Sequence, residues 1–248
     1  MSSYNPISVT VLTKNSEKYL EKVLEKASRF DEIAVLDTGS EDSTFEIIKN
    51  FPKVTLYKSP FLGFGPSHNL ISSLAKHDWI LSLDSDEILT DALIEEILQV
   101  KLHPSCVYSF PRKNFYRGKW IKGCGWYPDR VFRLYNRNET RFTDALVHES
   151  IITTNLKEVS LKAAVEHTPY ENTEEFLKKM HLYTSLFAKD KKGKRRGTFA
   201  KAFSHGLFAF FKSYLLQRGA LLGSQGFEIS AYNGISSYYK YLVLRDLY

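Results

Sequence analysis

The sequence predicts an α/β protein with a largely parallel sheet and a helical, amphipathic C-terminal extension. Three observations lead to this fold class. Strand-like and helix-like patterns alternate over residues 7–104, which is typical of βαβ units. Hydrophobic residues make up 43% of the chain, which indicates globular material with a core. From Asn172 onward the pattern is helical and rich in Phe and Tyr.

Apolar, β-branched runs predict four strands in the first half, at residues 7–12, 32–37, 53–57 and 79–83. Apolar residues at helical spacing predict a helix after each strand, at residues 16–30, 43–51, 66–77 and 90–100. A Ser43/Glu46 capping box, Pro66 at a first helical position and Thr90 as a cap indicate helix starts. In such a sheet, ligands bind beyond the carboxyl ends of the strands.

After residue 104 the pattern changes. A hairpin is predicted over residues 106–121, followed by strands at 129–136 and 145–152. Three helical segments come next: one that begins at an Asn172/Glu175 capping box and runs to about Lys189, one at 198–217, and one over the last residues.

Composition narrows the function classes. The net charge is +6, with +7 between Arg112 and Arg141 and +5 between Lys189 and Arg196, so we expect an anionic partner unless these are solvated faces. Two cysteines, Cys106 and Cys124, are too few for a disulfide framework or a metal site, which favours a reduced, cytosolic compartment. We find no leader pattern and no apolar stretch of the ~18–20 residues that a spanning helix needs.

The stretch "ILSLDSDEIL" at residues 80–89 ends an apolar strand in two aspartates, Asp84 and Asp86. Residues i and i+2 of a strand point the same way, so the two carboxylates can share one ligand. Such close charges favour a cation, and Mg²⁺ or Mn²⁺ suits carboxylates plus phosphate oxygens. The alternative is a solvated turn that caps the next helix. Glu87 either supports this site or supplies charge at a helix N-terminus.

Asp37 ends the second predicted strand. An acidic residue at this point of a nucleotide-binding fold accepts hydrogen bonds from a ribose or a base. A structural role is the equal alternative.

The motifs together resemble those of inverting glycosyltransferases of family 2. Their order is Thr13-Lys14-Asn15 after the first strand, Asp37 after the second, Ser67-His68-Asn69 before the fourth and Asp84-Ser85-Asp86 at its end. The later "GWYPDRVFRLY" (125–135), "VHE" (147–149) and the aromatic, basic C-terminus resemble the branch of small lipopolysaccharide core β-1,4-glucosyltransferases. The general resemblance covers residues 7–170, and the resemblance to the branch covers nearly the whole chain.

This resemblance implies a GT-A fold with a Rossmann-like sheet. Residues 1–170 would form the catalytic domain, with a nucleotide-sugar half at 1–104 and an acceptor half at 105–170, and residues 171–248 a helical region associated with membrane or acceptor. The implied nucleotide-binding residues are Thr13, Asn15, Glu17, Asp37, Asn69 and Asp84. The implied ligands of Mg²⁺ or Mn²⁺ are Asp84, Asp86 and His148.

The catalytic base is a point of departure from the family. Many members carry it in a Glu-Asp pair at the start of a helix, and this sequence has no such pair at the expected place. Asp129 in "YPDR" is the first candidate, with an ion pair to Arg130 or Arg133 as its alternative role. Glu149 is the second candidate. The Q-x-x-R-W motif of processive members is absent, which favours transfer of a single sugar.

The segment 198–217 has a wide apolar surface interrupted by basic residues and follows a basic run. It resembles an interfacial helix attracted to anionic lipid, and a helix of the core is the alternative. We therefore expect a metal-dependent hexosyltransferase that is cytoplasmic and peripheral on the inner face of the inner membrane. Its expected partners are a UDP-sugar donor, a phosphorylated glycolipid acceptor and an anionic membrane surface, with no nucleic acid. A transferase with another glycan acceptor, a sugar nucleotidyltransferase and a non-enzymatic nucleic-acid binder are the alternatives.

Overall fold

The computed structural model of the chain describes residues 5–193 and 196–247, which divide into two compact units. The first unit holds the residues up to Arg112 together with Arg130–His167. The second holds Lys113–Asp129 and the residues from Thr168 onward. One boundary therefore lies close to the expected division at residue 170, while residues 113–129 cluster with the C-terminal helices.

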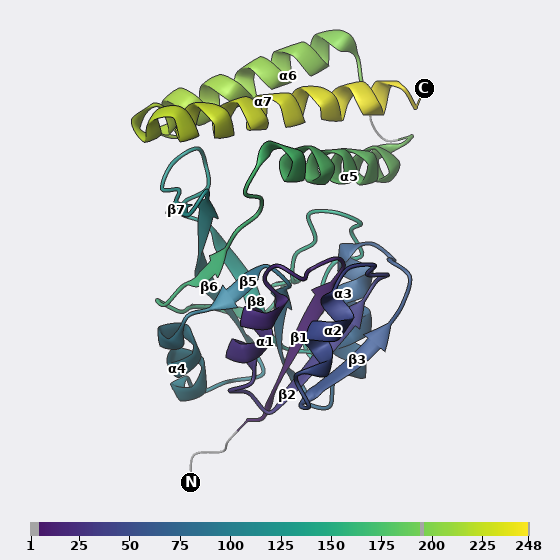
Figure 1. Ribbon diagram of the computed structural model, residues 1–248, viewed down its shortest axis with the longest axis vertical. Helices are drawn as coiled ribbons and strands as arrows, with labels where there is room; N and C mark the ends of the chain where they lie inside the picture. The colour runs from purple at the N-terminus through teal and green to yellow at the C-terminus, as the bar shows by residue number, and fades with distance from the viewer. Residues whose placement is uncertain (1–4, 194–195, 248) are drawn as a thin grey trace. The chain divides into compact units, whose positions relative to one another are not determined.

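The first unit is built on a sheet flanked by helices (Figure 1). Its strands are β1 Ile7–Thr13, β2 Glu32–Asp37, β3 Val54–Lys58, β4 Trp79–Asp84, β5 Glu87–Leu89, β6 Cys106–Tyr116, which continues into the second unit, β8 Arg130–Asn136, β9 Lys157–Ser160 and β10 Val165–His167. The strand order is β3-β2-β1-β4-β8-β6-β10-β5, and β9 pairs with β6. Strands β1 to β4 are parallel and β8 is antiparallel to β4, so the predicted α/β class is confirmed.

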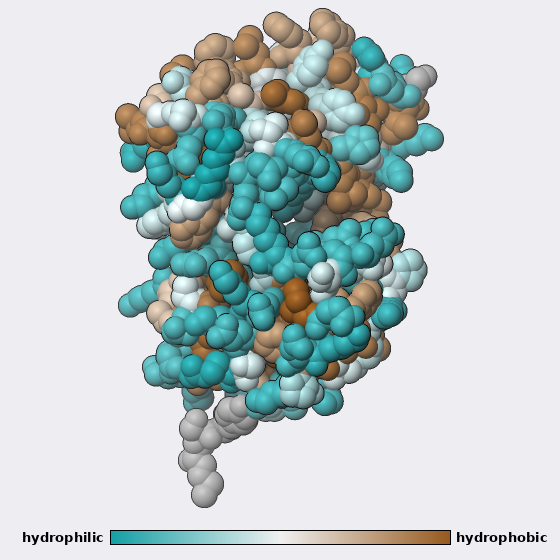
Figure 2. Space-filling model, in the orientation of Figure 1, coloured by the Kyte–Doolittle hydropathy of each residue, from teal (hydrophilic) through white to brown (hydrophobic). Residues whose placement is uncertain are grey.

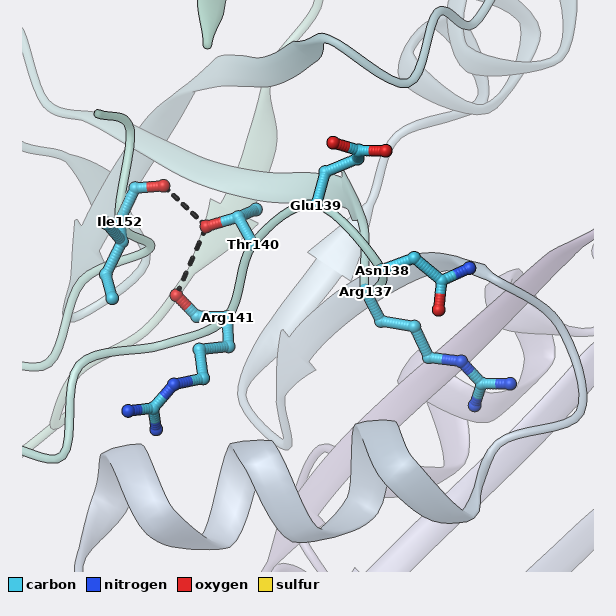
Figure 3. A pocket seen from close by; sticks show the side chains of 6 residues that line it. All are labelled: Arg137, Asn138, Glu139, Thr140, Arg141 and Ile152. Carbon is cyan, nitrogen blue, oxygen red and sulfur yellow. Dashed lines mark hydrogen bonds between the residues drawn. The ribbon is translucent and has the colours of Figure 1, made fainter. Parts of the chain in front are cut away.

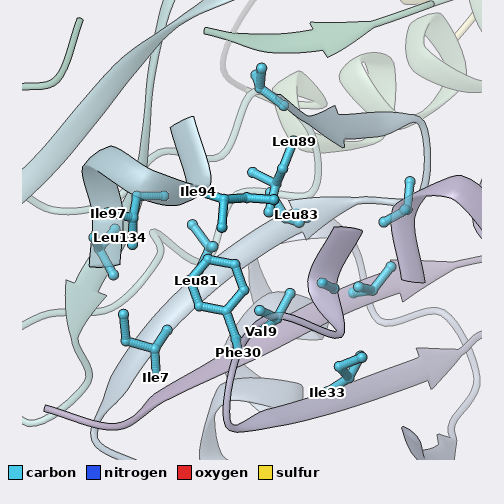
Figure 4. Close-up of a cluster of buried hydrophobic side chains, with 14 of the residues drawn as sticks. Ile7, Val9, Phe30, Ile33, Leu81, Leu83, Leu89, Ile94, Ile97 and Leu134 are labelled. Atoms are coloured by element: carbon cyan, nitrogen blue, oxygen red, sulfur yellow. The ribbon is translucent and has the colours of Figure 1, made fainter. Parts of the chain in front are cut away.

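The helices of the first unit are α1 Leu20–Ala27, α2 Thr44–Lys49, α3 Phe64–Leu74 and α4 Asp91–Gln99. Helix α1 buries Leu20, Val23, Leu24 and Ala27, which recur at helical spacing in the sequence. These side chains join a core with the strands, in which Leu81, Leu83 and Ile94 are fully buried (Figure 4). Each such leucine or isoleucine contributes about 1.5–3 kcal/mol relative to an exposed one. This core holds the strand ends in place.

The predicted helix starts have different outcomes. Thr90 caps α4, because its side chain accepts a hydrogen bond from the Leu93 amide at 3.2 Å. The start predicted at Ser43 is confirmed, because Ser43 is the N-cap of α2, but the Ser43/Glu46 capping box is wrong. The Ser43 side chain makes no cap bond, and the Ser43 amide donates instead to Glu17 Oε2 at 3.1 Å. A side chain from the preceding loop has replaced the local one.

The predicted strand at 145–152 is wrong, because these residues lie in a loop. The loop packs along α3, where the Gly65 amide donates to the Ala145 carbonyl at 3.1 Å. A Cβ on Gly65 would lie 1.9 Å from the carbonyl oxygen of Thr143, so only glycine allows this approach. His148 has a φ of +57°, which a strand does not accommodate.

The second unit consists of a short hairpin and helices. Its elements are the end of β6, β7 Lys119–Trp120, α5 Thr173–Lys191, α6 Phe199–Phe211, the π-helical turn Lys212–Leu216, the 3₁₀ turn Gly219–Leu222 and α7 Gly223–Arg245. The predicted hairpin at Arg117-Gly118 is confirmed by the pairing of Phe115 with Trp120. The Asn172 cap of α5 is confirmed too, because its side chain accepts from the Glu175 amide at 2.9 Å.

The core of the second unit is aromatic. Tyr116, Phe176 and Tyr232 are buried together with Ile121 and Ile229. Phe176 and Tyr232 stack with ring centroids 4.0 Å apart. Among the described residues, no helix combines the length and apolar character required to cross a membrane.

Candidate functional site

Polar side chains gather at the carboxyl edge of the parallel strands. The strand register pairs Thr13 with Asp37 and Leu12 with Asp84, so the ends of β1, β2 and β4 lie side by side. Lys58, at the end of β3, pairs with Asp37. Segments far apart in the sequence therefore meet at the edge where sheets of this kind bind ligands.

The two aspartates of the stretch "ILSLDSDEIL" lie in different structural settings. Asp84 is the last residue of β4, whereas Asp86 belongs to a turn that leads into β5. The expectation that both point the same way along one strand is therefore wrong, because the strand ends between them. Both carboxylates still reach the surface, with side chains 31% and 24% exposed. The turn is tied to the end of β1 through Ser85 Oγ, which lies 2.7 Å from Ser16 Oγ.

Asp84 lies beside two nitrogen-bearing side chains. Arg133, from β8, forms a short ion pair with Asp84 Oδ2, and His68 Nε2 lies 3.5 Å from Oδ1. Burial alone would raise the pKa of Asp84, but the Arg133 charge and the His68 contact outweigh it and hold this pKa well below its usual range. Asp84 is therefore ionised across the physiological pH range.

Glu87 is the anchor of this charge cluster. Its side chain is fully buried and accepts hydrogen bonds from Arg133 Nη2 at 2.8 Å and from Arg112 Nη1 at 3.1 Å. The Asp84 amide donates to its second oxygen at 3.2 Å. Of the two roles considered for Glu87, the structure favours support of the site, because Glu87 lies in β5 and precedes the Thr90 cap of α4. Three residues of "LDSDE" thus have three environments.

Each of the two aspartates has a histidine next to it: His68 beside Asp84 and His167 beside Asp86. His68 is fully buried in α3, lies 3.1 Å from Ser82 Oγ through Nδ1 and stacks on Phe142 with ring centroids 4.6 Å apart. His167 Nε2 lies 3.4 Å from Asp86 Oδ2. The sequence singled out His68 only through its motif and did not identify His167. His167 has no sequence signature, because only the fold brings it to the carboxylate.

Glu149 belongs to the same charge cluster. Burial, followed by the charge of Asp84, raises the pKa of Glu149, and the charges of His68 and Arg133 oppose this only in part. A carboxylate with a raised pKa beside an ionised one is suited to accept a proton. The neighbouring His148 is exposed in the loop along α3.

Thr13 and Asp37, which are predicted to bind the nucleotide, are the last residues of β1 and β2. Asp37 Oδ1 accepts from the amides of Gly39 and Ser40, at 2.9 and 3.0 Å, and its other oxygen accepts from the Ser40 hydroxyl. The Thr13 hydroxyl is buried and has no hydrogen-bond partner within the described residues. Asp37 therefore shapes the loop after β2, and contact of Thr13 or Asp37 with a nucleotide stays a prediction.

Asn15 and Glu17 join the loops after β1 and β2. The Asn15 side chain accepts from the Glu41 amide at 2.8 Å, and the Glu17 carboxylate accepts from the Ser43 amide. Asn15 itself has a φ of +50°, which asparagine tolerates better than most residues. These contacts are structural, and a contact with a nucleotide stays a prediction for both residues.

Asn69 has a structural role that the sequence did not indicate. Its side chain donates to the Phe142 carbonyl at 3.0 Å and accepts from the Phe142 amide at 2.9 Å. Both ends of the amide therefore hold the backbone of Phe142, the residue that stacks on His68. Nucleotide contact by Asn69 stays a prediction.

Asp129 belongs to the second unit. Its Oδ2 accepts a hydrogen bond from Asn114 Nδ2 at 3.1 Å, which orients the carboxylate. Its role as a catalytic base stays a prediction.

A shallow pocket of about 330 Å³ lies away from these carboxylates, lined by Arg137, Asn138, Glu139, Thr140, Arg141 and Ile152 (Figure 3). The strand register pairs Asn136 with Trp79, at the amino end of β4, so the pocket follows the opposite edge of the sheet. Thr140 Oγ1 donates to the Ile152 carbonyl at 2.5 Å and closes one wall. No residue predicted for the site lines this pocket.

Within residues 5–193 and 196–247, no group of three or more His, Cys, Asp or Glu gathers to hold an ion. Mg²⁺ and Mn²⁺ need only one or two carboxylates when phosphate oxygens and water complete the shell. The partly exposed oxygens of Asp84 and Asp86 fit that mode, and His148 as a ligand stays a prediction.

The sheet, parallel in its first half and with an antiparallel return, is that of a GT-A fold. The model of Glycosyl transferase family 2 matches residues 8–155, and the chain belongs to this family. Among solved structures, the mannosyltransferase PcManGT from Pyrobaculum calidifontis, in complex with GDP-Man and Mn²⁺, is similar with a TM-score of 0.55. It is 14% identical, and the match covers 97% of this chain and 88% of the other, so this likeness shows the fold.

Two curated relatives match nearly the whole chain. An uncharacterised glycosyltransferase of Rickettsia prowazekii is 26% identical, over 97% of this chain and 87% of its own. The lipopolysaccharide core biosynthesis glycosyltransferase LpsC of Rhizobium meliloti is 25% identical, over 98% and 92% respectively. The similarity therefore extends through the C-terminal helices, beyond the part that the family model matches.

Proposed function

We propose that the protein is an inverting transferase that moves one hexose, glucose, from a UDP-sugar to a heptose of the lipopolysaccharide or lipooligosaccharide inner core. The observation that carries this proposal is the edge of the sheet, where Asp37, Thr13 and Asp84 end neighbouring strands. Such an edge suits a nucleotide-sugar. The full-length similarity to LpsC supports the choice of acceptor class.

On the donor side, Thr13, Asn15, Glu17, Asp37 and Asn69 would define the nucleotide subsite. The buried Thr13 hydroxyl, which lacks a partner among the described residues, supports a ligand at this point. Asp84 and Asp86, with His148, would hold Mg²⁺ or Mn²⁺, which neutralises diphosphate charge when bound. Arg133 and His68 keep the Asp84 carboxylate ionised and in place.

Inversion requires a base that takes the proton of the acceptor hydroxyl as its oxygen attacks the anomeric carbon and UDP leaves from the opposite face. Asp129 and Glu149 are the two candidates. Glu149 gains support from its charged neighbours Asp84, His68 and Arg133. Asp129 gains support from the hydrogen bond that orients it. Asp129→Asn and Glu149→Gln separate them: the true base, when replaced, loses about 10²–10⁴-fold in turnover with UDP binding intact.

The proposed location is the cytoplasmic face of the inner membrane, with the protein held peripherally. The proposed partners are the UDP-sugar, a phosphorylated glycolipid acceptor and an anionic membrane surface. The segment from Lys189 to Arg196, with six basic residues and one acidic residue, supports an anionic partner.

Calorimetric titration tests the donor side of this proposal. UDP is titrated with and without Mn²⁺, followed by UDP-glucose, UDP-galactose and UDP-GlcNAc. We expect metal-dependent binding of UDP, with UDP-glucose the preferred sugar. No metal-dependent UDP binding would contradict the proposal.

Transfer assays test the acceptor. Purified core oligosaccharide with an exposed heptose should accept one sugar per site. Transfer only to an unrelated glycan or lipid-linked acceptor would retain the enzyme class and replace the acceptor.

A further inference from the structure

Helix α6 packs against α7 through its smallest side chains. Ala202 and Gly206 are the residues that α6 buries. A Cβ on Gly206 would lie 2.8 Å from Tyr238 Cβ and 3.1 Å from the carbonyl oxygen of Gly234, so the two backbones approach closely. A Cβ on Gly234 would in turn lie 3.1 Å from Phe210 Cβ. Gly206 and Gly234 therefore allow the two helix backbones to approach closely at the seam.

Phe210 packs on Phe227 of α7, but the other large apolar side chains of α6 are exposed. They are 47–63% exposed and comprise Phe199, Phe203, Leu207, Phe208 and Phe211. In Figure 2, apolar residues gather over α6 and α7. A helix pair in water buries its large apolar side chains between the helices. Helices in lipid do the reverse, since lipid chains are as apolar as leucine and small residues allow close packing.

The turn that joins α6 to α7 has the most exposed apolar residues of the described chain. Leu216 is 77% exposed and Leu221 80%, and Leu215 lies next to them at 59%. The buried side of the turn nevertheless makes specific contacts with α7. Ser213 is buried with its hydroxyl 2.9 Å from Ser230 Oγ, and Gly219 is buried against the same serine. The side of the turn that contacts α7 is therefore held in place, whereas its exposed side consists of leucines.

The charge of this region selects the partner. Between Lys191 and Phe227 the sequence has eight Lys or Arg and no Asp or Glu. A second copy would bring two identical cationic faces together, which repel each other. An anionic lipid surface attracts the same face and accepts its apolar side chains.

We propose that α6, the turn from Lys212 to Leu222 and the adjoining part of α7 form a hairpin that inserts into one leaflet of an anionic phospholipid bilayer. The leucines of the turn enter the acyl region, and Lys201, Lys212 and Arg218 contact lipid phosphates. With 13 residues, α6 is about 20 Å long, short of the ~30 Å hydrocarbon core. This inference rests on the proposed function only in that a glycolipid acceptor would be met on the same surface.

Vesicle flotation of the full chain tests this proposal. The probes are vesicles of phosphatidylcholine alone and of phosphatidylcholine with 30% phosphatidylglycerol, at low and high salt. The variant is Leu215→Gln/Leu216→Gln/Leu221→Gln. The matched control, Leu74→Gln/Leu98→Gln/Leu177→Gln, changes three other exposed leucines. UDP binding is measured on every protein.

We expect the wild type and the control to float with anionic vesicles, less so at high salt, and the hairpin variant to lose more than about tenfold in vesicle affinity. All three proteins should bind UDP alike. As a second readout of insertion, brominated lipid should quench the added fluorescence of Leu216→Trp but not that of Leu98→Trp.

Two results would overturn the proposal. One is equal flotation of the hairpin variant and the wild type. The other is a wild-type dimer without vesicle binding that the hairpin substitutions disperse, since a second copy would then cover the leucines. Vesicle binding by a wild type that binds no UDP would support the hairpin and contradict the proposed function.

Discussion

The first unit and helix α6 of the second unit differ in whether their large apolar side chains are buried. In the first unit, Leu81, Leu83 and Ile94 are fully buried in the core. In the second, Phe203 and Phe208 of α6 are more than half exposed, while Gly206 is buried. Burial of apolar side chains in the first unit is what surrounding water favours. Exposed apolar side chains on α6 are what the proposed membrane association favours, because lipid would then surround them.

The two units also differ in how their charged residues are paired. The first unit buries Glu87 and Arg133, and their cost is offset by direct pairing with each other, with Arg112 and with Asp84. In the second unit, the segment 191–227 has eight Lys or Arg and no Asp or Glu, although Asp190 beside it pairs with Lys191. Charge in the first unit is arranged to fix a site, and in the second it is suited to meet an outside partner.

The largest expected effect is on turnover at the first unit's edge. Asp86→Asn should lower turnover about 10³-fold, because the proposed metal site would lose a charged ligand in a step where diphosphate charge develops. Steady-state kinetics with UDP-glucose measures this. Asp78→Asn is the control, since Asp78 is an exposed partner of Arg137. Near-normal turnover of Asp86→Asn would show that the motif has no catalytic role.

The next effect is on stability. Glu87→Gln should lower the free energy of unfolding by about 3–5 kcal/mol, because two arginines lose the buried carboxylate that pairs with them. Urea unfolding measures this. Glu46→Gln, which removes an exposed pair with Lys49, should change the free energy by less than about 1 kcal/mol. Equal losses for the two variants would contradict the anchoring role of Glu87.

The fold of the first unit was predictable, because its information is local. Alternating apolar runs gave the four parallel strands, and the β-branched residues of β1, β2 and β4 are buried as the pattern requires. The strand at 145–152 failed for a physical reason. "ALVHESII" has the composition of a strand, but its backbone bonds to the start of α3, which no local pattern encodes.

The carboxylates of the site were predictable from their place at strand ends, but their partners were not. Arg133 lies 49 positions from Asp84, and His167 lies 81 positions from Asp86. Only the antiparallel return of β8 and the pairing of β10 with β5 bring these side chains together. The amphipathic helix at 198–217 was predictable from its composition, whereas the inward position of its small residues emerged only from its packing on α7.

A smaller effect on stability tests the reversed packing of α6. Gly206→Ala should lower the free energy of unfolding by about 1–2 kcal/mol, because its Cβ would lie 2.8 Å from Tyr238 Cβ, an overlap that the better helix propensity of alanine offsets only in part. Phe208→Ser, on the exposed side, should change it by less than about 0.5 kcal/mol. Thermal and urea unfolding in the absence of lipid compare the two. A larger loss for Phe208→Ser would show that the phenylalanine is part of a core.

The last prediction concerns Glu149, where stability and function should oppose each other. Its raised pKa means that the folded state binds a proton more tightly than the unfolded state. Stability is therefore lost as the pH rises from the ordinary glutamate pKa of about 4.3 through the raised value. Glu149→Gln should remove this loss, so the variant should unfold at higher urea than the wild type at pH 7.5, with a smaller difference near pH 4. Exposed Glu139→Gln is the control. A variant less stable than the wild type at pH 7.5 would contradict this prediction. It would show that hydrogen bonds of the Glu149 carboxylate stabilise the fold by more than its burial and the repulsion from Asp84 destabilise it.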